Sequence, residues 1–450
     1  MSEQAANPVR STKASERAKR RQVATLDLPA IVSSPSPTPE AGASDEYGAP
    51  VTSAATPAAE TRLDHGRIAV LGLVTIACYG AWFYAFGVLI DPIVDDTGWS
   101  YTEVSASFSL GQVLIGAASI VGGVMLDRYG SRAMFATAAG IAAVAFAVVS
   151  VAGHPIVFIA AAAIGMGALG ALAFYHVTMA VTVRVNPASP ARAIAVLTLW
   201  GAASSAIYLP LTAWLEDELG WRATVRILAA SAVVTLLVAV AMVNSGGSRG
   251  SAVPAISLRD TVAGVTRNSD GRRFVIVVGL TGLSISVLLV YQVPIMRSAG
   301  LGTATAASIA GLRGIAQLGG RIPIGRLLRR HHTNTLLATA LVFLAIAALV
   351  INGSQWVPVA LVFAVLAGLG IGAFIPLQGI RSEELFDRTS LGTTMGLLAS
   401  ISMTAGAIGP VAAGAITDTT GTPRPASWIA AAAAGAAAVL VSRPARRQCA

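Results

Sequence analysis

Three polar residues recur at intervals of four in the apolar segment GLRGIAQLGGR: Arg313, Gln317 and Arg321. Residues four apart lie on one face of an α-helix. An arginine at the centre of a membrane span costs about 2.5 to 3.5 kcal/mol, so this face is expected to line a watery cavity. A guanidinium offers paired donors that match a carboxylate or another oxyanion, so the spacing predicts an anion site. The alternative for Arg321 is a structural residue near a helix end, and for the deeper Arg313 a side chain that extends to the interface.

A second candidate for chemistry is His176, which stands beside Tyr175 in an apolar stretch. Histidine changes charge close to neutral pH, so His176 is a candidate acceptor for a coupling proton. The alternative is a neutral ring hydrogen-bonded to a backbone or hydroxyl group. Other polar-tipped side chains near the centres of apolar runs suit a small organic solute, together with Tyr175. They are Tyr79, Trp200, Tyr208, Tyr291 and Gln292. Packing or lipid contact is the alternative for each.

The composition that surrounds these residues is typical of a membrane protein. Of 450 residues, 54% are hydrophobic and 12% are charged, with a mean hydropathy of +0.69. A spanning helix needs about 20 apolar residues, and such runs predict twelve spans, all after residue 66. They cover residues 68–93, 102–126, 133–152, 156–183, 191–215, 221–243, 274–296, 303–328, 334–351, 356–380, 391–416 and 426–441. The predicted fold class is an all-α membrane protein with two six-helix halves.

Polar stretches divide the chain into five parts. Residues 1–66 are rich in Ser, Pro, Ala and charged residues and have few large apolar side chains, which predicts a disordered cytoplasmic tail. The interval 244–273 begins NSGGSRGS and falls between the sixth and seventh spans, so it is expected to be a cytoplasmic linker. The six-helix halves are then 67–243 and 274–442, followed by a short tail, 443–450.

Charge is distributed unequally between the two sides of the predicted membrane. One side, which we call the basic side, carries Arg128, Arg132, Arg184, Arg192, Arg326, Arg329 and Arg330, among others. The opposite, acidic side carries Asp91, Asp95, Asp96, Glu216, Asp217 and Glu218. Because cytoplasmic loops retain Lys and Arg, both termini are predicted to be cytoplasmic in a multi-pass protein of the cell membrane. The net charge of +9 is spread over these loops and does not predict a nucleic-acid partner.

A charged loop follows the second span. It reads GVMLDRYGSR, and its informative residues are Gly123, Asp127, Arg128, Gly130 and Arg132. This pattern resembles the hallmark loop of the major facilitator superfamily. The resemblance implies a twelve-helix secondary transporter in which these residues latch neighbouring helices in one access state, with glycine allowing the tight turn. The alternative is a loop that only sets topology. The segment after the eighth span, GRIPIGRLLRR, is a weak repeat of this loop.

Softer patterns resemble one branch of that superfamily, the monocarboxylate and oxalate/formate porters. They are the Gly-Trp-Ser of residues 98–100, the connector ELGWR at 218–222 and the segment SEELFDRTSLGTTMG at 382–396. The resemblance implies that Arg321 is the substrate-linked arginine of that branch. Gln317 stands where those porters often have an acidic residue, so their proton-coupling scheme does not carry over directly.

The sequence therefore predicts a secondary transporter that moves a small, monocarboxylate-like organic anion by alternating access with a proton as the coupling ion. Export of a drug-like or toxic compound is the alternative, although Ala161 stands where drug/proton antiporters have an arginine. A non-transporting membrane sensor is a third possibility. Sequence motifs for metal, nucleotide or nucleophilic catalysis are absent, which predicts no enzyme activity, metal or cofactor. The expected partners are the solute, the proton and membrane lipid, and the expected state is a monomer.

Overall fold

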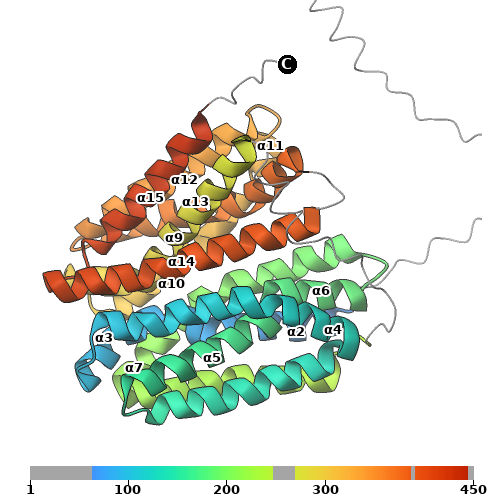
Figure 1. Cartoon of the computed structure of the whole chain (residues 1–450), viewed down its shortest axis with the longest axis horizontal. Helices are drawn as coiled ribbons and strands as arrows, with labels where there is room; N and C mark the ends of the chain where they lie inside the picture. The colour runs from blue at the N-terminus through green and yellow to red at the C-terminus, as the bar shows by residue number, and fades with distance from the viewer. Residues whose placement is uncertain (1–62, 247–268, 387–390, 444–450) are drawn as a thin grey trace, which may run out of the picture. The chain divides into compact units, whose positions relative to one another are not determined.

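The structure is a computed structural model that describes residues 63–246, 269–386 and 391–443. These residues form helices and connecting turns, and no strand occurs among them (Figure 1). Most of the predicted tail 1–66, the linker 244–273 and the tail 443–450 lie outside the described residues. We refer to residues 63–246 as the N-terminal half and to 269–443 as the C-terminal half.

The N-terminal half begins with one bent helical stretch. It consists of α2 (His65–Cys78), a π-helical turn η2 (Tyr79–Tyr84) and α3 (Phe86–Thr97). The following helices are α4 (Tyr101–Val151), α5 (Pro155–Ala173), α6 (Tyr175–Val185) and α7 (Pro190–Met242).

The C-terminal half has shorter, separate helices. They are α9 (Ser269–Ser298), α10 (Thr303–Arg321), α11 (Ile324–Leu327), α12 (Thr333–Val350) with the turn η3 (Ile351–Gly353), α13 (Val357–Leu385), α14 (Leu391–Thr420) and α15 (Ala426–Ser442).

Each of the twelve predicted spans falls within helical segments of the described chain, and two long helices each contain two spans. The chain reverses inside α4 at Gly130, with φ 78° and ψ 176°, and inside α7 at Gly220, with φ 74° and ψ 164°. Side chains make this backbone region unfavourable, so glycine permits both reversals. The fourth predicted span is split at Phe174 into α5 and α6, and the eighth ends at Arg321, before α11.

By length and composition, eight helical stretches in the described part of the chain are long and apolar enough to cross a membrane. They represent nine predicted spans, because the stretch Arg192–Met242 contains two. The other three spans are the first part of α4 and α10, where polar residues lower the hydropathy, and α15, which has 17 residues. The predicted class, an all-α multi-pass membrane protein, is confirmed.

The Gly-Trp-Ser signature has a local structural reason. Gly98 ends α3 in the left-handed conformation, with φ 70°. Ser100 then caps α4: its hydroxyl accepts a hydrogen bond from the Glu103 amide, and the Glu103 carboxylate accepts one from the Ser100 amide. The signature therefore makes a tight connection between two neighbouring helices on the acidic side.

The two halves meet along two main seams, where α4 packs on α14 and α7 packs on α10. Figure 1 shows α14 running beside α4. Small residues allow the close approach: a Cβ on Gly414 would lie 2.7 Å from the backbone oxygen of Tyr101, and one on Gly314 would overlap the hydroxyl of Ser205. These seams position the residues of the cavity described next.

Candidate functional site

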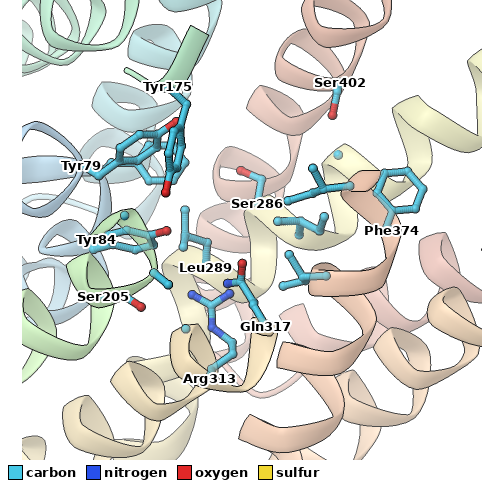
Figure 2. A pocket seen from close by; sticks show the side chains of 18 of the residues that line it. Tyr79, Tyr84, Tyr175, Ser205, Ser286, Leu289, Arg313, Gln317, Phe374 and Ser402 are labelled. Atoms are coloured by element: carbon cyan, nitrogen blue, oxygen red, sulfur yellow. The ribbon is translucent and has the colours of Figure 1, made fainter. Parts of the chain in front are cut away.

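A cavity of 590 Å³ is lined by residues of both halves. The N-terminal half contributes side chains from η2, α4, α6 and α7, and the C-terminal half contributes them from α9, α10, α13 and α14. Its polar and aromatic lining consists of Tyr79, Phe83, Tyr84, Gln112, Tyr175, Thr198, Ser205, Ser286, Arg313, Gln317, Arg321, Phe374, Gln378 and Ser402. Figure 2 shows the tyrosines on one side, Phe374 on the opposite side and Arg313 between them.

Arg313 is the most buried charged group of this cavity. Its exposed fraction is 1%, and two guanidinium nitrogens, Nε and Nη2, have no hydrogen-bond partner among the described residues. Burying a cation without a partner is costly, because it loses its hydration and gains nothing in return. The Arg313 guanidinium is therefore an uncompensated positive charge at the cavity wall, and it favours an anion as the molecule that occupies the cavity.

Gln317 and Arg321 extend the polar line along α10. The Arg321 Nη2 atom lies 3.5 Å from the Gln317 carbonyl oxygen, and Arg321 Nε has no partner among the described residues. No Asp, Glu or His occurs among the described residues that line the cavity. The predicted grouping of Arg313, Gln317 and Arg321 is thus present, and the cavity has an uncompensated positive charge.

A wall of aromatic rings lies on the side of the N-terminal half. Tyr79 and Tyr84 are five residues apart, which in a regular α-helix would separate their directions by about 140°. The π-helical turn η2 closes i to i+5 hydrogen bonds instead, including Ala85 N–H to Gly80 O at 3.3 Å. Both tyrosines therefore face the cavity, with their ring centroids 6.1 Å apart.

The break between α5 and α6 separates two neighbouring predicted residues. Phe174 is extended, with ψ 179°, and Tyr175 then turns into the cavity, where its hydroxyl donates to Thr198 O at 3.3 Å. His176 is exposed and does not line the cavity; its Nε2 atom lies 3.3 Å from Ala171 O. Because the break leaves the Ala171 carbonyl without its helical partner, His176 has a local structural contact there.

Four other predicted contacts also lie outside the cavity lining. Trp200 packs against Gly72, while Tyr208 is buried and shares a hydrogen bond with Ser231 Oγ at 2.8 Å. The remaining two, on α9, are fully buried. The Tyr291 hydroxyl shares a 2.8 Å hydrogen bond with Ser105 Oγ, and Gln292 donates to Leu289 O at 3.1 Å. Trp200, Tyr208 and Tyr291 thus make contacts between helical segments, whereas Gln292 bonds within α9.

The charged loop after the first part of α4 is tied to its own half. Asp127 forms an ion pair with Arg184 of α6, whose Nη1 atom also donates to Leu126 O at 3.1 Å. Arg132 donates to Ala241 O at 3.4 Å, and the Arg128 guanidinium lies 5.4 Å from the centroid of the Tyr129 ring. Gly130 makes the reversal of α4. Gly123 has open space at its Cβ position.

Sequence reasoning missed several members of this set. The sequence places Arg184 on the basic side of the membrane but does not indicate that it pairs with Asp127, 57 residues away. Tyr84, Phe374, Gln112 and Ser286 were also missed. A search for polar residues in apolar spans would have found the last two, whose Gln112 Nε2 to Ser286 Oγ bond of 2.6 Å joins the halves.

Several hydrogen bonds between described residues of the two halves lie between the acidic side and the level of the cavity. In addition to the Gln112 and Tyr291 bonds, Arg297 donates to Asp91 at 2.6 Å. The Asp418 carboxylate accepts from the backbone amides of Tyr101 and Thr102, at 2.8 and 3.0 Å. These bonds hold the two halves together from the acidic side to the level of the cavity.

Comparisons with known proteins identify the family and the fold. The sequence profile of the Major Facilitator Superfamily matches residues 71–267 and 274–448. No protein of curated function matches the sequence. Solved structures with a similar fold include the nucleoside transporter NupG, with a TM-score of 0.70 and 13% identity over 83% of this chain and 96% of that one.

Two further structures are similar. A POT family transporter in complex with 5-aminolevulinic acid has a TM-score of 0.64 and 12% identity, over 83% of this chain and 94% of that one. A D-xylose-proton symporter has a TM-score of 0.63 and 14% identity, over 84% and 97%. At these identities, the likenesses show the fold.

Proposed function

The chain belongs to the major facilitator superfamily, and from this premise we propose that it transports a small, monocarboxylate-like organic anion by alternating access in symport with a proton. The family and the fold indicate a transporter rather than an enzyme. The proposal includes a location in the cell membrane, cytoplasmic termini and function as a monomer.

The observation that carries the proposal is the unpaired, buried guanidinium of Arg313 in the cavity. Gln317 and Arg321 add donors along the same helix face, and the described lining has no carboxylate to neutralise them. A carboxylate substrate would supply the missing acceptor oxygens, whereas a cation would add to the repulsion. Tyr79 and Tyr175 line the opposite wall and are proposed to contact the body of the substrate.

The inter-half bonds support a proposed access state. Since these bonds lie between the acidic side and the cavity, we assign the structure to a state in which the cavity communicates with the basic side, which is cytoplasmic in the proposed topology. We assign Gly123, Asp127, Arg128, Gly130 and Arg132 to a latch that contacts the C-terminal half in the opposite state. In the present state their partners lie in the N-terminal half, as expected for an open latch.

Proton coupling is supported by charge balance and by a structural neighbour that is a proton symporter by name. A proton that accompanies a monoanion makes the cycle electroneutral, so the membrane potential does not oppose uptake. His176 does not line the cavity, so the proposal does not assign the proton to it.

The test is counterflow in proteoliposomes with labelled lactate, pyruvate, formate, oxalate and the larger monocarboxylate 3-phenylpropionate, at two pH values. We expect Arg313→Gln and Arg321→Gln to lower counterflow of the accepted anion by about tenfold or more, because each removes a charged donor. Arg326→Gln is the matched control, since Arg326 is exposed on α11. Acid stimulation of net uptake would support symport.

Folded protein that shows no counterflow of any carboxylate, or counterflow that is equal in the arginine variants, would overturn the anion proposal. Export of a drug-like compound is then the function to test.

A further inference from the structure

We infer that the transported monocarboxylate carries an aromatic ring, so that the substrate class is an aryl-substituted carboxylate rather than a three-carbon or two-carbon acid. This inference rests on the proposed function, because it assumes that Arg313 binds a carboxylate. It concerns the part of the cavity that the carboxylate does not fill.

The size of the cavity is the first reason. Its volume is 590 Å³, in the range of pockets that enclose drug-sized ligands, about 300 to 1,000 Å³. One water occupies about 30 Å³ in the liquid, and a three-carbon acid is only a few times larger than a water molecule. Such an acid would therefore leave most of the cavity to solvent. Apolar and aromatic walls hold such water poorly, and a larger apolar body gains by displacing it.

The placement of the rings is the second reason. Tyr79, Tyr84 and Tyr175 form one wall, with the Tyr79 centroid 6.1 Å from that of Tyr84 and 5.6 Å from that of Tyr175. Phe374 of α13 lines the other wall, and Figure 2 shows it across the cavity from the tyrosines. Rings prefer offset or edge-to-face partners, so an aromatic ring that lies against either wall finds favourable contacts there.

The position of the π-helical turn η2 is the third reason, because it brings Tyr84 into the aromatic wall of the cavity. π-turns are rare and occur frequently at functional sites. In a regular helix, Tyr84 would turn away from Tyr79, and the cavity would lose a ring with a hydroxyl near Arg313. Figure 2 shows the Tyr84 hydroxyl and the Arg313 guanidinium directed into the same space.

Together these features define a bipolar site. Arg313 and Gln317 recognise a carboxylate at one end, and the tyrosines and Phe374 enclose a ring beside it. A neutral ring compound would leave Arg313 unpaired, and a small acid would leave the walls empty. Affinity therefore requires both parts of the ligand, joined by a short linker.

The experiment measures binding to the full-length protein in nanodiscs by isothermal titration calorimetry. The ligands are propionate, 3-phenylpropionate, 3-cyclohexylpropionate, 3-phenylpropionamide and 3-phenylpropylamine. We expect 3-phenylpropionate to bind about tenfold or more tighter than propionate. The affinity for 3-phenylpropionate should also exceed that for the cyclohexyl analogue by about threefold, because only an aromatic ring makes offset or edge-to-face contacts with the rings that line the cavity. The neutral amide and the amine should bind at least about tenfold more weakly than the carboxylate.

Variants separate the two ends of the site. Phe374→Leu keeps apolar volume but removes the ring, and should lower the affinity for 3-phenylpropionate about three- to tenfold and that for propionate by less. Tyr84→Leu should act in the same direction. Trp356→Ala is the control, because Trp356 is exposed and does not line the cavity. Arg313→Gln should weaken both carboxylates.

The outcomes distinguish this inference from the function on which it rests. If propionate and 3-phenylpropionate bind equally and both depend on Arg313, the aromatic substrate is wrong and the anion transporter stands. If the cyclohexyl analogue equals the phenyl ligand and Phe374→Leu has no effect, the ring requirement is wrong. If no carboxylate depends on Arg313, or the amine binds best, both proposals are wrong.

Discussion

Asp91 of α3 and Arg297 of α9 form an ion pair that joins the two halves of the protein, with Nη1 and Oδ2 2.6 Å apart. The Tyr101 hydroxyl donates to the other carboxylate oxygen at 3.1 Å. The side chains are 11% and 32% exposed, so water screens this pair less than the Asp96–Arg222 pair, which is 49% and 39% exposed and lies within one half. The inter-half pair therefore has the larger influence on how the two halves are held together on the acidic side.

Arg297→Gln is expected to loosen the acidic side, because it leaves the Asp91 carboxylate partly buried without its cation. In a background with Ser402→Cys in the cavity and both native cysteines replaced, Cys78→Ala and Cys449→Ala, a membrane-impermeant thiol reagent added on the acidic side should react with the introduced thiol about tenfold faster. Arg222→Gln, the matched control, should change the rate less than about twofold. The exchanged pair Asp91→Arg with Arg297→Asp should restore slow labelling, and failure to do so would contradict the role of the charge pair.

The ion pair between Asp127 and Arg184 leads to a separate prediction for transport. Asp127→Asn removes the carboxylate that pairs with Arg184 on the basic side, where the first part of α4 and α6 both end. Counterflow should therefore fall about tenfold while substrate affinity stays unchanged. Affinity is preserved because neither residue lines the cavity. Asp217→Asn, at an exposed position on the acidic side, is the control. An equal loss of affinity would place Asp127 in substrate binding and refute the latch.

Gly130 and Gly123 predict opposite responses to the same substitution. Gly130→Ala forces a side chain into a backbone region that only glycine readily adopts, and should destabilise the protein by about 1 to 3 kcal/mol. Gly123→Ala has open space around the added methyl group and regular helical backbone, so it should be neutral or stabilising. Thermal unfolding in detergent checks both; equal melting temperatures for the two variants would contradict the argument.

His176→Gln is expected to retain acid-stimulated uptake. The histidine is exposed outside the cavity, and its contact is the backbone oxygen of Ala171, which a glutamine amide can also reach. The measurement is the pH dependence of counterflow and net uptake, with Tyr175→Phe as the neighbouring variant inside the cavity. A flat pH profile in His176→Gln alone would restore His176 as the coupling group.

Much of the fold was predictable because it depends on short-range sequence patterns. Apolar runs of spanning length located the helices, and glycine at positions 130 and 220 permits the two reversals. The superfamily resemblance carried by residues 123–132 agrees with the profile match. The cationic line of Arg313, Gln317 and Arg321 was also predictable, since helix periodicity alone places three residues of one helix on one face.

The rest of the site depends on contacts between segments that are distant in sequence, or on departures from regular helix. The π-turn brings Tyr84 beside Tyr79, and the break at Phe174 sends Tyr175 into the cavity but leaves His176 outside. From the sequence, Tyr291 was an equally suitable candidate for substrate contact, but in the structure its hydroxyl is hydrogen-bonded to Ser105 of the other half. The regular α-helical repeat does not predict where the helix becomes a π-turn or breaks. Composition does not reveal which helix a buried polar side chain will contact. Which of these side chains line the cavity depends on how the helices pack, so only the tertiary structure determines it.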